Sequence, residues 1–195
     1  MFAVRFALLS SFFYALNVSM VPFIYSLGIG AFLFLFFRFS TTFVVSLVMT
    51  KSLFSFAQIK QQGLGYWLLL LALLHGIQSW LFVEAVNYMP VGLASVVLYT
   101  YPLITYLMYC FSKSKVPDLT TILMFLMAII GIAALSQGSD GIQSLIIGLG
   151  LALLSATTLG TILHFTPKIS SMKNWEIVKY TTFLPALTYM ALFLY

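Results

Sequence analysis

Tyrosines and a proline lie in the middle of an uncharged segment, where hydrocarbon surroundings would be expected. The segment YMPVGLASVVLYTYPLITYLM covers residues 88–108. Helical spacing of three and four residues places five of its residues on one stripe: Gly92, Ser95, Tyr99, Pro102 and Tyr106. A proline frees a backbone carbonyl, and a buried phenol needs a hydrogen-bond partner. The stripe therefore predicts a polar cavity that binds a small molecule, and close helix packing is the alternative. Tyr101, beside the proline, is a further binding candidate.

Other polar residues interrupt neighbouring apolar segments. Asn17, His75 and Gln78 are candidates for contact with the same small molecule. His75 could titrate or bind, and a hydrogen-bonded structural histidine fits the sequence equally well. Because polar residues lie on two faces of the segment around His75, we predict that this helix lies inside a bundle.

Two charges, Arg38 and Glu84, lie well inside apolar segments. Counting from the segment ends at 1.5 Å per residue places Arg38 about 12 Å deep and Glu84 about 6 Å deep. An unpaired charge at such depth is costly, so a partner or water is expected. We predict that the two meet, either as a static pair or as a gating or proton-coupling site. Outward snorkelling of Glu84 is the alternative.

The composition excludes a soluble domain. Of 195 residues, 62% are hydrophobic and 7% are charged, with mean hydropathy +1.08, whereas a soluble domain carries about 25% charge. The chain is therefore predicted to be an integral membrane protein, and its net charge of +5 does not indicate nucleic-acid binding. The sequence has no metal-ligand cluster, phosphate-binding glycine loop or nucleophile–base motif. We predict no enzyme activity, no metal and no cofactor.

Seven apolar runs can be counted, which predicts an all-α, multi-pass helical bundle. The first six cover about 5–27, 30–50, 66–88, 90–111, 118–137 and 143–166. A seventh begins near Trp175, and its 16 residues from Tyr180 to the end are short for a full crossing. We therefore expect a last helix that is cut off.

The cations of the connections alternate with the runs. Lysines follow the second, fourth and sixth runs, whereas the connections near Gly28, Tyr88 and Asp140 contain no Lys or Arg. The cations concerned are Arg5, Lys51, Lys60, Lys113, Lys115, Lys168, Lys173 and Lys179. By the positive-inside rule, the N-terminus is predicted to be cytoplasmic, in an inner or plasma membrane.

A weak internal repeat joins the two ends of the chain. Ala7-Leu8-Leu9-Ser10 recurs as Ala152-Leu153-Leu154-Ser155, and the same offset of 145 carries Pro22 onto Pro167. Five runs separate the copies. Because five is odd, the second copy would cross the membrane in the opposite direction, as in the inverted repeats of secondary transporters.

The third and fourth runs resemble a hairpin of the EamA-type members of the drug/metabolite transporter superfamily. The matching residues are Ala85-Val86, Tyr88, Met89-Pro90, Gly92, Ala94-Ser95 and Pro102. Asn17 and Arg38 match residues that this family often carries in its first and second helices, whereas Tyr14-Ala15 replaces its usual Trp-Gly. Members have ten helices, so the resemblance implies a chain that stops after about seven. Residues 1–138 would form a first five-helix repeat, and residues 139–195 the first two helices of an incomplete second repeat.

This resemblance implies a secondary transporter, of the exporting kind, for small metabolites such as amino acids or nucleosides. The expected partners are the substrate, the lipid bilayer and a coupling proton, and a homodimer is left open. Aromatic walls and few charges favour an uncharged or zwitterionic substrate. The alternatives are a non-transporting membrane subunit, a receptor-like protein, or an inactive fragment of a transporter.

Overall fold

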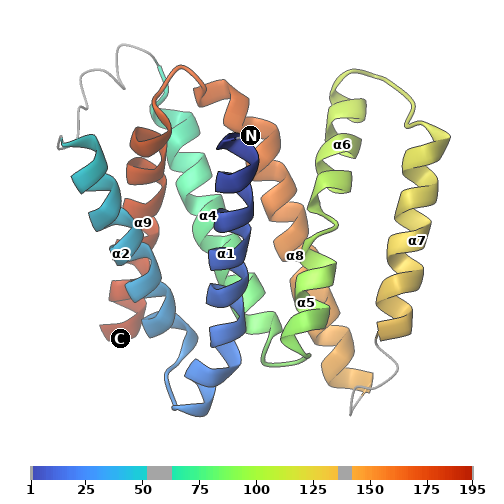
Figure 1. The fold of residues 1–195 in the computed structure, drawn as a ribbon, viewed down its shortest axis with the longest axis horizontal. Helices are drawn as coiled ribbons and strands as arrows, with labels where there is room; N and C mark the ends of the chain where they lie inside the picture. Colours follow the sequence, from blue (N-terminus) through green and yellow to red (C-terminus); the bar gives the residue numbers. More distant parts are fainter. Residues whose placement is uncertain (1, 52–62, 136–141, 195) are drawn as a thin grey trace.

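Every element that the computed structural model describes is a helix (Figure 1). The structure describes residues 2–51, 63–135 and 142–194. In chain order the helices are α1 (Phe2–Ser26), α2 (Ala31–Thr50), α4 (Gly65–Ala85), α5 (Val91–Leu98), α6 (Tyr101–Ser112), α7 (Leu119–Leu135), α8 (Ile142–Phe165), the 3-10 turn η2 (Thr166–Ile169) and α9 (Asn174–Leu194). The all-α multi-pass prediction is confirmed.

The described helices follow the apolar runs closely. Five helical segments are long and apolar enough to cross a bilayer, among them Val91–Ser112, which combines α5 and α6. The last helix is longer than expected. The 21 residues of α9 reach spanning length because the helix already begins at Asn174, six residues before Tyr180. The expectation that this helix is too short to cross was wrong.

Helix α4 lies at the centre of the bundle. It packs against α8 on one side and against α9 and α2 on another, and ten of its residues are buried. Three clusters of buried hydrophobic residues lie between the helices. The largest joins α1, α4, α5 and α8 around Val97 and Ala152, which are both 0% exposed. The predicted interior position of this helix is confirmed. At the opposite extreme, α7 stands at one edge of the bundle (Figure 1).

The described lysine-bearing connections gather at one end of the bundle. The N-terminus, the α6–α7 connection and the α8–α9 connection lie at the top of Figure 1, and the α1–α2 and α4–α5 connections lie at the bottom. Lys113 and Lys115 are exposed in the α6–α7 connection. Lys60 and Asp140 lie outside the described residues. The helices therefore alternate in direction, as the cation pattern requires.

Lys179 departs from that pattern. It was counted among the cations of a connection, but it lies within α9 and is 1% exposed. Its ammonium lies 5.2 Å from the centre of the Tyr180 ring. The helix begins close to the predicted position, but its residues up to Lys179 were not counted as part of the crossing, and Lys179 lies more than one helical turn inside the helix.

Candidate functional site

The helix that carries the tyrosine stripe is broken in its middle. Helix α5 ends at Leu98, and α6 begins at Tyr101. Across the break, the Thr100 N–H bonds to the Val97 carbonyl at 3.1 Å, three residues back, instead of the usual four. Pro102 lies in the first turn of α6 and has no N–H for the Leu98 carbonyl. Transporters place their binding sites at such interruptions near the membrane midplane.

Two cavities meet at this break, and Tyr99 lines both of them. The first, about 190 Å³, lies between α1 and α5 and is bounded by Tyr14, Gly92 and Ser95 among others. The second, about 370 Å³, lies between α5–α6 and α7 and is bounded by Pro102, Tyr106 and Thr121 among others. All five stripe residues therefore face a cavity. We take this pair of cavities as the candidate site.

Phenols and one cation gather beside the first cavity. The Tyr14 side chain interacts electrostatically with Arg38 of α2 and with Tyr99 and Tyr101 of the broken helix. Tyr101 and Pro102 flank the break, and Tyr101 is half-buried. Three helices thus bring hydroxyl donors and a guanidinium toward one region, where they can hydrogen-bond a small polar molecule.

Arg38 has an aromatic and neutral surrounding. Its guanidinium carbon lies 6.0 Å from the centre of the Phe39 ring, and its charge acts on His75 of α4 and Tyr189 of α9. Between Arg38 and the acidic residues in the described part of the chain, there is no ion pair within 4 Å. Arg38 therefore lies at a meeting point of α1, α2, α4 and α9 without an acidic partner there.

Glu84 lies elsewhere, so the predicted meeting of Arg38 and Glu84 does not occur in this structure. The Asn87 side-chain amide donates a hydrogen bond of 3.3 Å to the Glu84 carboxylate, and Glu84 acts electrostatically on Tyr25 of α1. Tyr25 in turn donates to the carbonyl of Val83 at 3.3 Å. Glu84 thus belongs to the turn that joins α4 to α5. The depth of a residue along a helix can be counted in the sequence. The rotation of the helix about its axis, which determines the neighbours of that residue, cannot be counted in this way.

His75 and Asn17 lie away from the two cavities. The His75 ring meets the Phe39 ring edge to face, with 5.7 Å between centres, and Phe39 also stacks on Tyr189 at 5.8 Å. Asn17 is half-buried on α1. Its neighbours Ala15, Val18 and Ser19 line the smaller cavity. His75 therefore joins the aromatic contact between α2, α4 and α9.

Gln78 is engaged in a contact between helices. Its side-chain amide donates to the Ser155 hydroxyl of α8 at 3.1 Å, and that hydroxyl donates to the Gln78 carbonyl at 3.0 Å. The Ser79 hydroxyl donates to the Gln78 side-chain oxygen at 3.4 Å. Gln78 is buried and lies in the α4–α8 contact, so its geometry favours a structural role over contact with a ligand.

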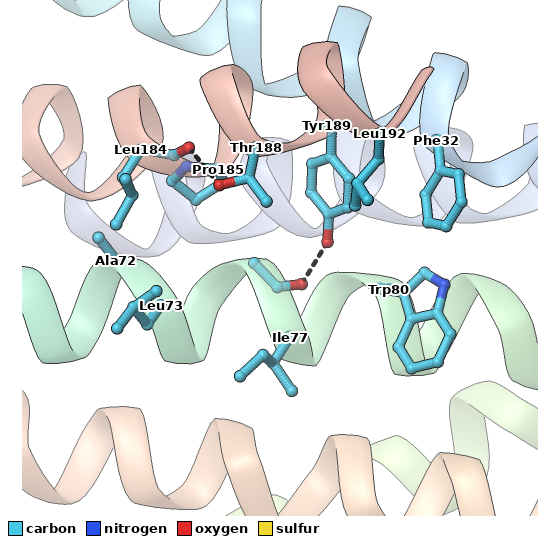
Figure 2. Close-up of a pocket in the computed structure, with 11 residues that line it drawn as sticks. Phe32, Ala72, Leu73, Ile77, Trp80, Leu184, Pro185, Thr188, Tyr189 and Leu192 are labelled. Carbon is cyan, nitrogen blue, oxygen red and sulfur yellow. Dashed lines mark hydrogen bonds between the residues drawn. The ribbon is translucent and has the colours of Figure 1, made fainter. Parts of the chain in front are cut away.

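A third cavity, an apolar groove of about 290 Å³ between α4 and α9, was not foreseen (Figure 2). Its lining residues include Trp80, Pro185 and Leu192. The Tyr189 hydroxyl points onto α4 and donates to the Gly76 carbonyl at 2.7 Å, and the Thr188 hydroxyl donates to the Leu184 carbonyl at 3.0 Å. Because these hydroxyl protons are already donated, the groove offers few polar anchors. No signal in the sequence pairs helices so far apart in the chain.

Lys179, which the sequence pattern placed in a connection, lies buried inside α9. A buried lysine is rare in a membrane helix and marks a functional position more often than other residues do. A signal for it existed: an acidic residue such as Glu176 is favoured in the first turn of a helix, and a helix that starts just before it carries Lys179 inward.

Comparison with known proteins identifies a family. The model of the EamA-like transporter family matches residues 1–137, which covers α1 to α7 and therefore both cavities. No curated protein matches the chain, and no solved structure matches it.

Proposed function

We propose, from the premise that this chain belongs to the EamA-like transporter family, that it moves small organic metabolites across the cell membrane by alternating access. Amino acids and nucleosides are the expected substrates, and export is the expected direction. The N-terminus and the lysine-bearing connections would lie in the cytoplasm. The family accounts for transport and for the expected export, and the expected substrate class also rests on the chemistry of the site.

The observation that carries this proposal is the broken helix with a cavity on each side. A continuous membrane helix satisfies its own backbone groups, and irregular backbone is tolerated only beside protein or a watery space. Here the break at Tyr99–Thr100 adjoins two cavities whose polar lining includes the hydroxyls of Tyr14 and Tyr99. A closely packed structural kink would not need such space.

The contact between α2 and α9 supports the proposed division into residues 1–138 and 139–195 as inverted repeats. The two helices run antiparallel (Figure 1), and rings stack at Phe39–Tyr189 and Phe43–Phe183. Under the repeat offset of 145, position 39 corresponds to position 184, and position 189 corresponds to position 44. The pair 39–189 therefore corresponds to the pair 44–184, and each of these positions is one residue from the observed pair Phe43–Phe183. A two-fold axis in the membrane plane would produce such a self-complementary contact.

Solute counterflow tests the proposal. The protein, expressed from its native gene, is reconstituted in liposomes loaded with one unlabelled amino acid or nucleoside at a time, and entry of the labelled compound is followed. A carrier gives transient accumulation of the tracer, with no need to know the coupling ion. A receptor or structural subunit would bind without accumulation. If no amino acid or nucleoside shows counterflow, the proposed substrate class is wrong.

A further inference from the structure

We infer that Arg38 is the residue that recognises the substrate, through a carboxylate, so that the transported molecule is a small carboxylic acid or zwitterion. This inference rests on the proposed function and narrows it, because nucleosides have no carboxylate. It starts from a charge that the fold places inside the bundle and does not neutralise.

The chain has four acidic residues in all, and none of those described reaches Arg38. Glu84 is held at the α4–α5 turn by Asn87. Asp118 accepts hydroxyl hydrogen bonds from Tyr106 and Thr121 in front of α7. Glu176 lies in the first turn of α9, at the end of the bundle that carries the lysines. Asp140 lies outside the described residues. An anion for Arg38 is therefore not supplied by any described side chain.

The groups around Arg38 can tolerate its charge but cannot neutralise it. The charge of Arg38 acts electrostatically on Tyr14, His75 and Tyr189 of three other helices, and the Phe39 ring offers a weak cation–π contact at 6.0 Å. The hydroxyl proton of Tyr189 is donated to Gly76. A guanidinium has five N–H groups to satisfy, so this surrounding leaves most of them for a ligand or water.

The guanidinium nitrogens of Arg38 are not fully buried. Within the described part of the chain, no fully buried side-chain nitrogen or oxygen is left without a hydrogen-bond partner. The Arg38 side chain makes no hydrogen bond with described residues, so its nitrogens are not sealed from space around them. Tyr14 connects this space to the candidate site, because it lines the smaller cavity and lies within electrostatic range of Arg38.

The single positive charge of Arg38 matches a ligand that carries one negative charge. A carboxylate matches its two parallel N–H groups and carries one charge. A phosphate monoester carries nearly two charges and would call for a second cation nearby. Cavities of about 190 and 370 Å³ suit a molecule of amino-acid size. The aromatic walls would contact the apolar part. Arg38 lines neither cavity, so the acid group would have to reach past Tyr14, which lines the smaller cavity and interacts electrostatically with Arg38.

Removing the charge tests the inference without knowledge of the substrate. An unpaired inward cation destabilises the empty protein, so Arg38→Met and Arg38→Gln should raise its thermal midpoint in detergent by several degrees, as when a site trades stability for function. Lys51→Met is the matched control, because Lys51 is an exposed cation that follows the same helix, and it should leave the midpoint within error. A lower midpoint for both Arg38 variants would reveal a native anionic partner and overturn the inference.

Comparing each amino acid with its amide tests whether Arg38 recognises a carboxylate. Phenylalanine, leucine and serine, each as the free acid and as the amide, are added at millimolar concentration, with uridine as a neutral comparison. At least one free acid should raise the wild-type midpoint, its amide should not, and Arg38→Met should lose the effect. Equal stabilisation by acid and amide, retention in Arg38→Met, or no response to any acid would overturn the inference. Stabilisation by uridine alone would do so while leaving the carrier proposal intact. If free acids raise the thermal midpoint and their amides do not, but no compound shows counterflow, the role of Arg38 is supported and the proposed carrier function is refuted.

Discussion

Gln78 of α4 and Ser155 of α8 exchange two hydrogen bonds, 3.1 Å from amide nitrogen to hydroxyl and 3.0 Å from hydroxyl to backbone carbonyl. Ser155 is 0% exposed and Gln78 is 5% exposed, so water cannot replace either partner. The pair fixes the rotation of α4 against α8, and α8 in turn packs on both halves of the broken helix. The position of the candidate site therefore depends on a contact outside it.

Removing one partner of this pair should destabilise the fold. Gln78→Ala or Ser155→Ala leaves a buried polar group unsatisfied, at a cost of about 1–3 kcal/mol, visible as a lower thermal midpoint. The double variant should lose less than the sum of the single losses, because the two residues share their bonds. Gln143→Ala, at an exposed position of α8, is the control and should change little. Additive losses would show that the two residues act independently.

Tyr99 should matter for transport and not for folding. Its ring is 56% exposed and lines both cavities, so Tyr99→Phe removes a hydroxyl without leaving a packing defect. Loss of one hydrogen bond to substrate, about 1 kcal/mol, corresponds to roughly fivefold weaker counterflow, and Tyr99→Ala should lose more. Membrane abundance should stay near normal. Tyr66→Ala, a 67% exposed tyrosine on α4, is the control, and an equal loss there would argue against a binding role.

Gly160 should tolerate no large side chain. A Cβ atom there would lie 3.1 Å from Cγ2 of Ile104 on α6, and a β-branched neighbour has little freedom to move. Gly160→Leu should therefore separate α6 from α8 and cost about 1–3 kcal/mol in unfolding measurements. Gly150 lies on the same helix with no neighbour within 4 Å of such an atom. If Gly150→Leu destabilises as much, the α6–α8 contact is not the cause.

Asp118 should make the α6–α7 connection sensitive to acid. Hydrogen bonds from the hydroxyls of Thr121 and Tyr106 hold the pKa of the Asp118 carboxyl below its ordinary value of 3.8. The stabilisation is complete above that value and is lost as the pH falls through the lower folded pKa. Asp118→Asn should thus have a lower thermal midpoint than wild type at pH 7, and the difference should shrink below about pH 4.

Thr121→Val removes the strongest of these hydrogen bonds and should weaken the same pH dependence. Unchanged midpoint differences from pH 7 down to pH 3 in both variants would contradict this account of Asp118.

Cysteine labelling checks the sidedness. In a Cys110→Ser background, Leu27→Cys and Val116→Cys place thiols at 59% and 89% exposed positions on opposite ends of the bundle. With the lysine-bearing end in the cytoplasm, an impermeant maleimide should label only Leu27→Cys in intact cells and should reach Val116→Cys after permeabilisation. The reverse pattern would invert the proposed orientation.

The approximate positions of the described helices could be predicted because they depend on local properties, whereas the break between α5 and α6 and the full length of α9 were not predicted. Apolar length and the alternation of lysines placed the seventh helix near Trp175, and α9 begins at Asn174. Contacts between helices depend on rotation and could not be predicted. Gln78 and His75 are three residues apart, yet one contacts α8 and the other contacts α2. Arg38 and Glu84 were matched by depth alone, and they lie beside different neighbours.

The break between α5 and α6 divides one crossing into a more buried part and a more exposed part. Four of the eight residues of α5 are buried, whereas α6 buries Cys110 alone among its twelve. A hinge at Tyr99–Thr100 would make α6 a lever about 18 Å long, provided that its contact with α8 at Ile104 and Gly160 yields. The Tyr106–Asp118 hydrogen bond of 2.9 Å ties α7 to this lever. A tilt of about 10° would carry its tip, and α7 with it, through about 3 Å, enough to change the width of a passage by about one water molecule.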